Sequence, residues 1–448
     1  MKESQIAHLL ESALSRVKAD QGELLFQGGV SGTTRFADNR IHQNMVSEDY
    51  TITCRCVIRK RTGYATTNRF DSDSLTRMVK KAQEIAGKQT PDPDFQSLPS
   101  ASPYPQVQGC DEETATCTPE LRAEKIRKVI SAAESGGLSA AGQLTTTRRT
   151  LAVMNTQGLF AYHQGSQAEF SLTVLTPVSS GYSGEDSPHL SALSLEQLTE
   201  RAIRKALEGR KIQDLPPGDY PVILEPLAVG DMIDVLGWTG LGAKDMEEES
   251  SCFTGRMGTE VASSSITLVD DATNPRVYCT PFDFEGVPKR RVVLIDKGKA
   301  RGVVTDSYYA GKMKLKNTGH ATPRGEDGPQ PWHKILLPGE STVEEMIQGT
   351  ERGILVTRFW YTRLVDRKQT VFTGMTRDGT FLVENGKVTS GVRDFRFNQN
   401  ILEALSSVES ISKDQVYSSY VLAPALKIGS FRFTGRTAAR RGGRSWIS

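Results

Sequence analysis

The apolar positions of the first ninety residues change from a helical spacing to a strand spacing and back again. A stripe with the 3.6-residue period of a helix comes first, and short runs with strand character follow it. A second helical stripe closes the region, so the pattern predicts a helix, a set of strands and another helix. The stripes are Ile6, Leu9, Leu10, Ala13, Leu14 and Val17, then Leu75, Met78, Val79, Ala82 and Ala86, and the strand runs are 23–27, 33–37, 50–60 and 64–69.

A proline-rich stretch follows, and the same order of elements then returns. Residues 90–119 hold six of the twenty prolines and show no periodicity, so 90–117 is predicted to be a linker. Thr118 and Pro119 supply an N-cap and a first-turn proline for a new helix. Strand runs at 143–154, 159–163 and 168–176 precede a last helix with a capping box at Ser194 and Gln197.

The two copies also match position by position, 118 residues apart. The matched apolar residues alternate in both copies, as half-buried strands require. We therefore predict a duplicated helix–β-meander–helix unit, with copies at 1–89 and 118–213. The matches are Ile52, Cys54 and Cys56 with Phe170, Leu172 and Val174, and Thr62, Gly63 and Tyr64 with Ser180, Gly181 and Tyr182.

The remaining half, 214–434, is dominated by strand patterns. Asn385 and Gly386 between two apolar runs indicate a type I′ hairpin. One helix is expected after a capping box at Ser341 and Glu344, a second around 401–405, and a short helical patch at 227–236. The whole chain is therefore predicted to be α+β, with a large antiparallel β-rich C-terminal domain. Strands are expected at 262–269, 291–295, 302–308, 353–361, 370–375, 380–383, 388–395, 417–421 and 427–433.

Length and charge narrow the class of protein. The 448 residues are about three times an average domain, so several units are expected. With 55 basic and 53 acidic residues the net charge is +2, which argues against a nucleic-acid partner. The local excess of arginine at 435–448 is typical of a frayed basic tail, and a docking arm is the alternative. The absence of a signal peptide, a membrane-spanning stretch or a CxxC pair predicts a cytoplasmic protein.

Motifs that carry a mechanism are almost all missing. The sequence holds no HExxH, Walker A, GxSxG or phosphate-binding GxGxxG pattern. The six histidines are scattered, and His320 and His333, which flank a loop rich in Gly and Pro, are either functional or ordinary surface residues. The acidic residues Asp245, Glu247, Glu248 and Glu249 point around a helix, which favours a solvated face over a cation site.

Several segments, taken in order, resemble the TldD/PmbA family, whose members are often labelled modulators of DNA gyrase. Each segment alone is weakly specific, but their order and spacing match along residues 20–434. They are 61–68 (RTGYATTN), 264–271 (SSITLVDD), 282–288 (FDFEGVP), 317–319 (NTG), 339–346 (GESTVEEM), 352–356 (RGILV), 384–388 (ENGKV) and 395–398 (FRFN).

The resemblance implies a choice between two branches. TldD-like members are zinc peptidases with a helical HExxxH motif, whereas PmbA-like members, also called TldE, lack it and pair with a TldD-like partner. Alignment places the two histidines and the glutamate of that motif at Asp234, Thr239 and Val235. The C-terminal cysteine ligand would fall near 429–431, where there is none. This chain therefore resembles the PmbA/TldE branch, with no metal of its own and zinc expected on the partner.

The function that the resemblance implies is a metal-free subunit of a cytoplasmic TldD-type peptidase. Such a subunit would help enclose a chamber with a TldD-like partner or by self-association, and would hold unfolded or leader-type peptides by pairing with sheet edges. The residues predicted to line the peptide groove are Thr318, Gly319, His320 and Arg324.

Two other functions remain open. The first is a stand-alone peptidase that replaces the zinc site with Asp234, Asp283, Glu285 or His320. The second is a non-proteolytic regulator that binds gyrase or another protein, for which the near-neutral charge leaves room.

Overall fold

Residues 1–238, 240–325 and 327–436 are described by the computed structural model. Thr239 and residues 437–448, which form most of the predicted basic tail, lie outside the described residues. The N-terminal elements are α1 (Glu3–Leu14), β1 (Gln21–Ala37), β2 (Arg40–Ile58), β3 (Arg61–Thr67), α2 (Ser72–Lys88), α3 (Glu112–Ala115), α4 (Pro119–Ser135), β4 (Ser139–Asn155), β5 (Phe160–Leu175), β6 (Ser180–Ser187), the 3-10 helix η1 (Leu190–Ala192) and α5 (Leu195–Glu208).

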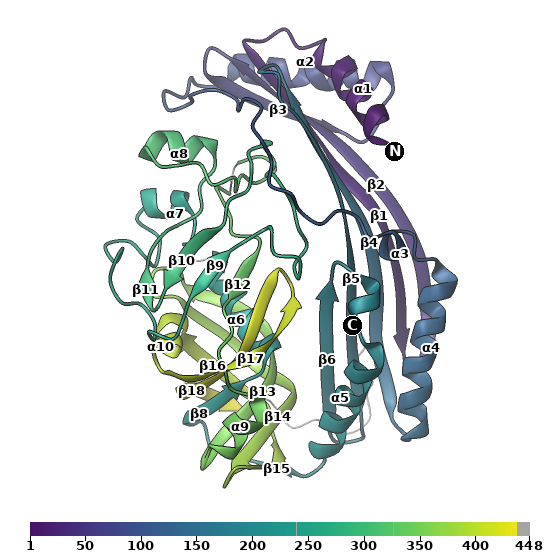
Figure 1. Cartoon of the computed structure of the whole chain (residues 1–448), viewed down its shortest axis with the longest axis vertical. Coiled ribbons are helices and arrows are strands. Elements are labelled where there is room, and N and C mark those ends of the chain that lie inside the picture. The colour runs from purple at the N-terminus through teal and green to yellow at the C-terminus, as the bar shows by residue number, and fades with distance from the viewer. Residues whose placement is uncertain (239, 326, 437–448) are drawn as a thin grey trace.

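Both copies of the repeat contribute three strands to one antiparallel sheet (Figure 1). The strand order is β3-β2-β1-β4-β5-β6, so the first strands of the two copies pair at the centre. The pairing extends from Glu23 opposite Asn155 to Phe36 opposite Gly142. The copies are therefore related by an approximate two-fold axis between β1 and β4, and they share one sheet.

Two strands are longer than the sequence predicts. The expected runs 23–27 and 33–37 form the single strand β1, and 159–163 and 168–176 are likewise joined in β5. The prediction of a break was wrong because the glycines of β1 serve a close approach between strands. A Cβ on Gly29 would lie 2.1 Å from the carbonyl oxygen of Arg148 on β4.

The four long helices pack against the sheet through two equivalent apolar cores. Gly63 on β3 and Gly181 on β6 are the matched glycines of the repeat, and each faces the helix of its own copy. A Cβ on Gly63 would lie 2.3 Å from the carbonyl oxygen of Ala82 on α2, and one on Gly181 would lie 2.2 Å from that of Ala202 on α5. In both copies, the glycine at this matched position therefore lets the helix backbone lie directly against the strand.

The stretch predicted as a linker contains the short helix α3. Asp111 caps this helix, because its side chain accepts a hydrogen bond from the backbone N–H of Thr114. Earlier in the stretch, the Tyr104 hydroxyl donates to the carbonyl oxygen of Gly286 in the C-terminal half. The stretch therefore runs along the seam between the two halves of the chain (Figure 1).

The C-terminal half is a larger mixed sheet with helices at its sides. β8 lies between β13 and β18 in this sheet. The helix α6 packs against β13 and β18. The elements are β7 (Ile212–Gln213), β8 (Gly218–Leu224), α6 (Pro226–Trp238), α7 (Ala243–Glu247), β9 (Leu268–Asp270), β10 (Val292–Asp296), β11 (Lys299–Ala300), α8 (Ser307–Met313), β12 (Lys334–Leu336), α9 (Val343–Gln348), β13 (Arg352–Asp366), β14 (Val371–Glu384), β15 (Lys387–Val392), β16 (Phe395–Asn400), α10 (Ile401–Ser406), β17 (Val408–Ser418) and β18 (Val421–Arg436).

The α+β prediction is confirmed, and three local predictions in this half need comment. Asn385 and Gly386 form the β14–β15 turn with positive φ at both residues, as a type I′ hairpin requires. The capping box before α9 is formed by Thr342 and Glu345, one residue later than predicted. The strand predicted at 302–308 is wrong, because Asp306 caps α8 by accepting from the backbone N–H of Tyr309.

Charged side chains join the two halves at the seam. Arg55 of β2 lies with Nη1 3.0 Å from Oε1 of Glu285 and 3.7 Å from Oε1 of Glu23. All three side chains are almost completely removed from solvent. Burial raises the pKa of Glu23 to about 8, with attraction to Arg55 opposing the shift. Glu23 is therefore largely protonated at neutral pH, and Arg55 is the ionic partner of Glu285.

No helix among the described residues is long and apolar enough to cross a membrane.

The helix–strand approach at the matched glycines generates a first prediction. Gly63→Ala and Gly181→Ala should each lower the free energy of unfolding by about 1–3 kcal/mol, because the new methyl group overlaps helix backbone. Gly87→Ala is the matched control, since a Cβ there meets nothing within 4 Å. It should stabilise the protein by about 0.5–1 kcal/mol through helix propensity. Urea denaturation measures all three variants, and equal stability of the first two with wild type would contradict this packing.

The raised pKa of Glu23 generates a second prediction. The folded protein holds a proton on Glu23 that the unfolded chain has lost above pH 4.5. This contribution to stability is therefore complete below pH 4.5 and is lost as the pH rises through about 8. Glu23→Gln should reduce the fall in unfolding free energy over this range by roughly 2–4 kcal/mol. Glu84→Gln, at an exposed position on α2, should leave the slope unchanged.

Candidate functional site

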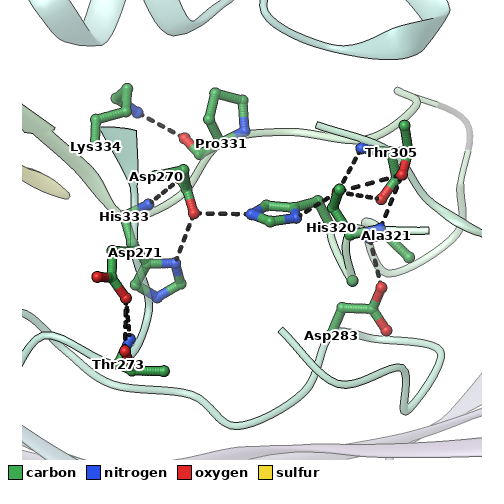
Figure 2. A network of polar contacts seen from close by, with 12 residues as sticks. Asp270, Asp271, Thr273, Asp283, Thr305, His320, Ala321, Pro331, His333 and Lys334 are labelled. Carbon is green, nitrogen blue, oxygen red and sulfur yellow. Dashed lines mark hydrogen bonds and ion pairs between the residues drawn. The ribbon is translucent and has the colours of Figure 1, made fainter. Parts of the chain in front are cut away.

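The helix α6 carries Asp234 and Val235, two of the three positions at which the family resemblance places a degenerate zinc motif. Asp234 is half-buried on this helix, and its Oδ1 lies 3.0 Å from Nζ of Lys334. Lys334 is the first residue of β12 and is 3 % exposed at its side chain. Its Nζ also donates to the carbonyl oxygen of Pro331 at 2.9 Å (Figure 2). The ammonium group of Lys334 is therefore the ionic partner of the Asp234 carboxylate.

The positions next to Asp234 carry no further metal-binding side chain among the described residues. A Cβ on Gly237 would lie 2.8 Å from Cδ of Lys334, so the lysine side chain crosses the helix where a side chain is missing. Val235 is 7 % exposed and belongs to the main apolar core of the C-terminal half. Thr239, the third motif position, lies outside the described residues.

The donor set at these positions does not fit a catalytic zinc ion. Such an ion needs three protein ligands and an open position for water. Asp234 is the one ligand type at the described motif positions, and it is already paired with Lys334. Within 429–431, where the resemblance implies a cysteine ligand, Phe431 is fully buried among aromatic rings. Over the described parts of the chain, no group of three or more His, Cys, Asp or Glu side chains is placed to hold a metal.

A cavity of about 880 Å³ nevertheless opens beside Asp234 and Lys334. The end of α6, the loop before β12, and the turns that join β13 to β14 and β17 to β18 form its walls. Three aromatic side chains line it: Trp238, Trp332 and Tyr420. Trp238 is 63 % exposed, and the rings of Trp332 and Tyr420 meet edge to face.

The cavity wall combines paired charges with polar atoms that lack a partner. Asp245, which is 5 % exposed, pairs with Arg367 at 2.5 Å, so its predicted place on a solvated face was wrong. Thr322 Oγ1 and Trp332 Nε1 are buried and have no hydrogen-bond partner in the described structure. A buried polar atom without a partner costs free energy, so these two atoms are the unsatisfied polar groups of the cavity wall.

A buried network behind the wall fixes the loop that lines the cavity. Asp270, at the end of β9, accepts from Nε2 of His320 at 2.8 Å and from the backbone N–H of His333 at 2.7 Å (Figure 2). The backbone N–H of Gln330 donates to the carbonyl oxygen of His320. The segment from Gln330 to Lys334 is thereby held against β9, with its outer side chains in the cavity wall.

Burial determines the charges in this network. Burial alone would raise the pKa of Asp270. The interactions of its carboxyl with His320, His333 and Lys289 are stronger than this effect of burial, and they hold the pKa well below its usual range. Burial lowers the pKa of His320, and it lowers the pKa of His333 to about 3. The second ring nitrogen of His320, Nδ1, lies 3.0 Å from the hydroxyl oxygen of Thr318, so both nitrogens of the buried ring have a polar partner.

Sequence reasoning missed this network. His320 is completely buried and His333 is 4 % exposed, so neither is the ordinary surface histidine that was one alternative. Their common partner, Asp270, lies fifty residues earlier and was noticed only as part of a family segment. The available signal was an aspartate directly after a short apolar run, which the sequence alone does not connect to either histidine.

The structure distributes the predicted groove residues between the interior and the surface. Thr318 Oγ1 accepts from the backbone N–H of Thr305 and donates to its carbonyl oxygen. Gly319 has a φ of 73°, and a Cβ added to it would lie 2.4 Å from the carbonyl oxygen of Pro288. His320 faces Asp270 inside the protein, and Arg324 is exposed. Arg324 is thus the most exposed of the four and Thr318 is half-buried, and peptide binding at this loop stays a prediction.

The remaining candidates for a replacement site form structural contacts. Asp283 accepts from the backbone N–H groups of Glu285, Val287 and Ala321, and it is 1 % exposed. Burial raises the pKa of Asp283 to about 7, and the charge of Glu285 adds to the shift. Glu285 is the partner of Arg55 at the seam. The two carboxyls therefore face backbone and arginine, and neither lines the cavity at Asp234.

Curated relatives match most or half of the chain. A Buchnera aphidicola protein named a TldD metalloprotease homologue is 23 % identical over 436 residues, or 90 % of this chain and 87 % of that protein. A Saccharolobus solfataricus protein named a zinc metalloprotease TldD homologue is 26 % identical over 218 residues, which is 45 % of this chain and 46 % of the relative.

Among solved structures, TldE from Thermococcus kodakarensis superposes with a TM-score of 0.86. At 22 % sequence identity the superposition covers 96 % of this chain and all of the other, so it shows a shared fold.

Family models cover most of the chain in three consecutive pieces. Residues 22–86 match domain 1 of the PmbA/TldA metallopeptidases, residues 117–210 match their central domain, and residues 217–435 match their C-terminal domain. The α6 helix and the cavity both lie within the third match. The chain therefore belongs to the PmbA/TldD metallopeptidase family.

Proposed function

We propose that this chain is a metal-free, PmbA/TldE-like subunit of a TldD-type zinc peptidase complex. It contributes assembly and peptide binding to the proteolysis of unfolded or leader-type peptides. The observation that carries the proposal is the ion pair between Asp234 and Lys334 at the wall of a large cavity. A lysine ammonium lies beside a position at which the family resemblance implies a metal ligand, and a cavity of about 880 Å³ opens next to it.

The chemistry of the site supports division of labour between two subunits. Hydrolysis by a zinc peptidase requires a bound water and a base that takes its proton. Val235 cannot accept a proton, and the carboxylate of Asp234 is engaged by Lys334. The hydrolytic step is therefore assigned to a zinc-bearing partner, for which relatives named zinc metalloproteases are the model.

The cavity has the features that an extended peptide requires. Charged, polar and aromatic side chains line it together, so it can contact both the main chain and the side chains of a peptide. The exposed ring of Trp238 and the paired rings of Trp332 and Tyr420 offer apolar contact to side chains of any sequence. Such contacts suit unfolded segments, because they read the backbone and apolar surface more than a particular residue.

A stand-alone peptidase finds less support in the geometry. Asp283, Glu285 and His320 are buried among their own hydrogen-bond partners, and Asp234 is paired. No specific contact favours the non-proteolytic regulator, and the reconstitution below separates it from the proposal.

Reconstitution with a TldD-like zinc protein from the same source tests the division of labour. The chain alone should leave an unfolded test peptide intact. The mixture should elute as one complex and cleave the peptide, and a chelator should abolish the cleavage. Cleavage by this chain alone, or recovery of gyrase without any zinc-bearing relative in an affinity purification, would contradict the proposal.

The cavity generates a further prediction for peptide affinity. Trp238→Ala should weaken the binding of a fluorescently labelled unfolded peptide to the complex about tenfold, as expected for loss of an aromatic anchor. Trp360→Ala is the matched control, because Trp360 is also exposed but does not line the cavity. Fluorescence anisotropy measures both, and equal effects of the two substitutions would place the peptide elsewhere.

A further inference from the structure

The duplication supplies a comparison between two equivalent sheet edges. β3 pairs with β2 only at residues 52–58, and β6 pairs with β5 only at residues 168–175. In each copy the short edge strand therefore covers only part of the strand beside it. The rest of that strand has no neighbouring strand on its outer side in the described structure. In copy one this is the segment 40–51 of β2, and in copy two it is the segment 160–167 of β5.

The chain covers the second of these edges with its own residues. Nε2 of His163 lies 3.0 Å from the carbonyl oxygen of Cys279, and the hydroxyl of Ser166 accepts from the backbone N–H of Asp111. The ring of Tyr278 lies against Gly165, where an added Cβ would be 2.8 Å from it. The C-terminal half and the stretch before α3 thus protect this edge.

The equivalent edge of β2 is open. Residues 44–49 are all exposed, and Met45 and Val46 retain 45 % and 53 % of their accessible surface. β2 lies on the side of the sheet away from the C-terminal half (Figure 1). An exposed strand edge with apolar residues at its centre is a template for another strand.

The charges along this edge indicate which strand fits. Arg40 stands at its beginning and Asp49 at its end, with Met45 between them, and neither charged residue forms an ion pair in the part of the chain that the structure describes. A register shift opposite Phe36 places an extra residue at His42, and Ile41 packs into the helix-side core. Arg40 therefore lies on the opposite, concave face, which it shares with Asp49.

Antiparallel pairing of two identical strands brings the beginning of one beside the end of the other. Let Met45 of each copy lie at the two-fold axis. The extra residue at His42 takes up one position, so Arg40 of each copy then faces Asp49 of the other. Two attractive pairs therefore form symmetrically. A single sign of charge along the edge would repel a second copy. Opposite signs at opposite ends instead make the strand complementary to itself.

We propose that β2 joins a second copy of this chain through antiparallel pairing of residues 40–49, which merges two six-stranded sheets into one. The surface lies on the first copy of the repeat and is separate from the cavity at Asp234, so the inference does not rest on the proposed peptidase role.

Charge reversal tests the pairing in the full chain without any other protein. Sedimentation equilibrium should show a dimer for wild type. Arg40→Glu or Asp49→Arg should raise the dimer dissociation constant about tenfold or more, because each places like charges face to face twice. The double variant carrying both reversals should restore the wild-type value. Lys81→Glu, at an exposed position on α2, is the control for the change in net charge and should leave the dimer intact.

A cysteine at the axis tests the register. Met45→Cys should give a disulfide-linked dimer on mild oxidation, which wild type, with its own six cysteines, should not give. A wild-type chain that stays monomeric at tens of micromolar overturns the proposal, and so does a dimer that both single reversals leave unchanged. Folding of each variant is verified by circular dichroism, and rescue by the double variant excludes simple misfolding.

Discussion

The antiparallel pairing of β1 with β4 is the constraint on which the rest of the structure depends. It joins the two copies of the repeat along their longest strands, from Glu23 to Phe36. The helices of both copies then cover one face of a single sheet, and the C-terminal half packs against the other. Because the sheet is continuous, Arg55 in copy one and Ser180 in copy two can both bond to the C-terminal half, through Glu285 and Asp378.

The C-terminal half, supported in this way, holds the cavity beside Asp234 and Lys334. β9 and β12 pair so that Asp270 lies opposite Lys334, and this register also brings His333 beside Asp270. One short ladder therefore fixes both the buried Asp270 network and the lysine that reaches Asp234. The positive charge of Lys334 offsets the negative charge of Asp234, since the two charged atoms lie 3.0 Å apart with little exposure at the lysine.

Local patterns predicted much of the fold, and contacts between distant residues explain the rest. The repeat and the hairpin at Asn385 and Gly386 follow from neighbouring residues and spacing, whereas the degenerate motif at Asp234 and Val235 follows from the family resemblance alone. The continuity of β1 was missed because glycine breaks most strands, and here it serves close contact with β4. The pairing of Asp234 with Lys334 spans a hundred residues, and that of Asp270 with His320 spans fifty, so no local pattern signals either.

The central claim is that Lys334, and not a metal, neutralises Asp234. The most direct test is the zinc content of the purified full-length chain after saturation with zinc and desalting, measured by inductively coupled plasma mass spectrometry. The account predicts far less than one zinc per chain. One tightly held zinc per chain, located at Asp234 by anomalous scattering in a crystal, would contradict it.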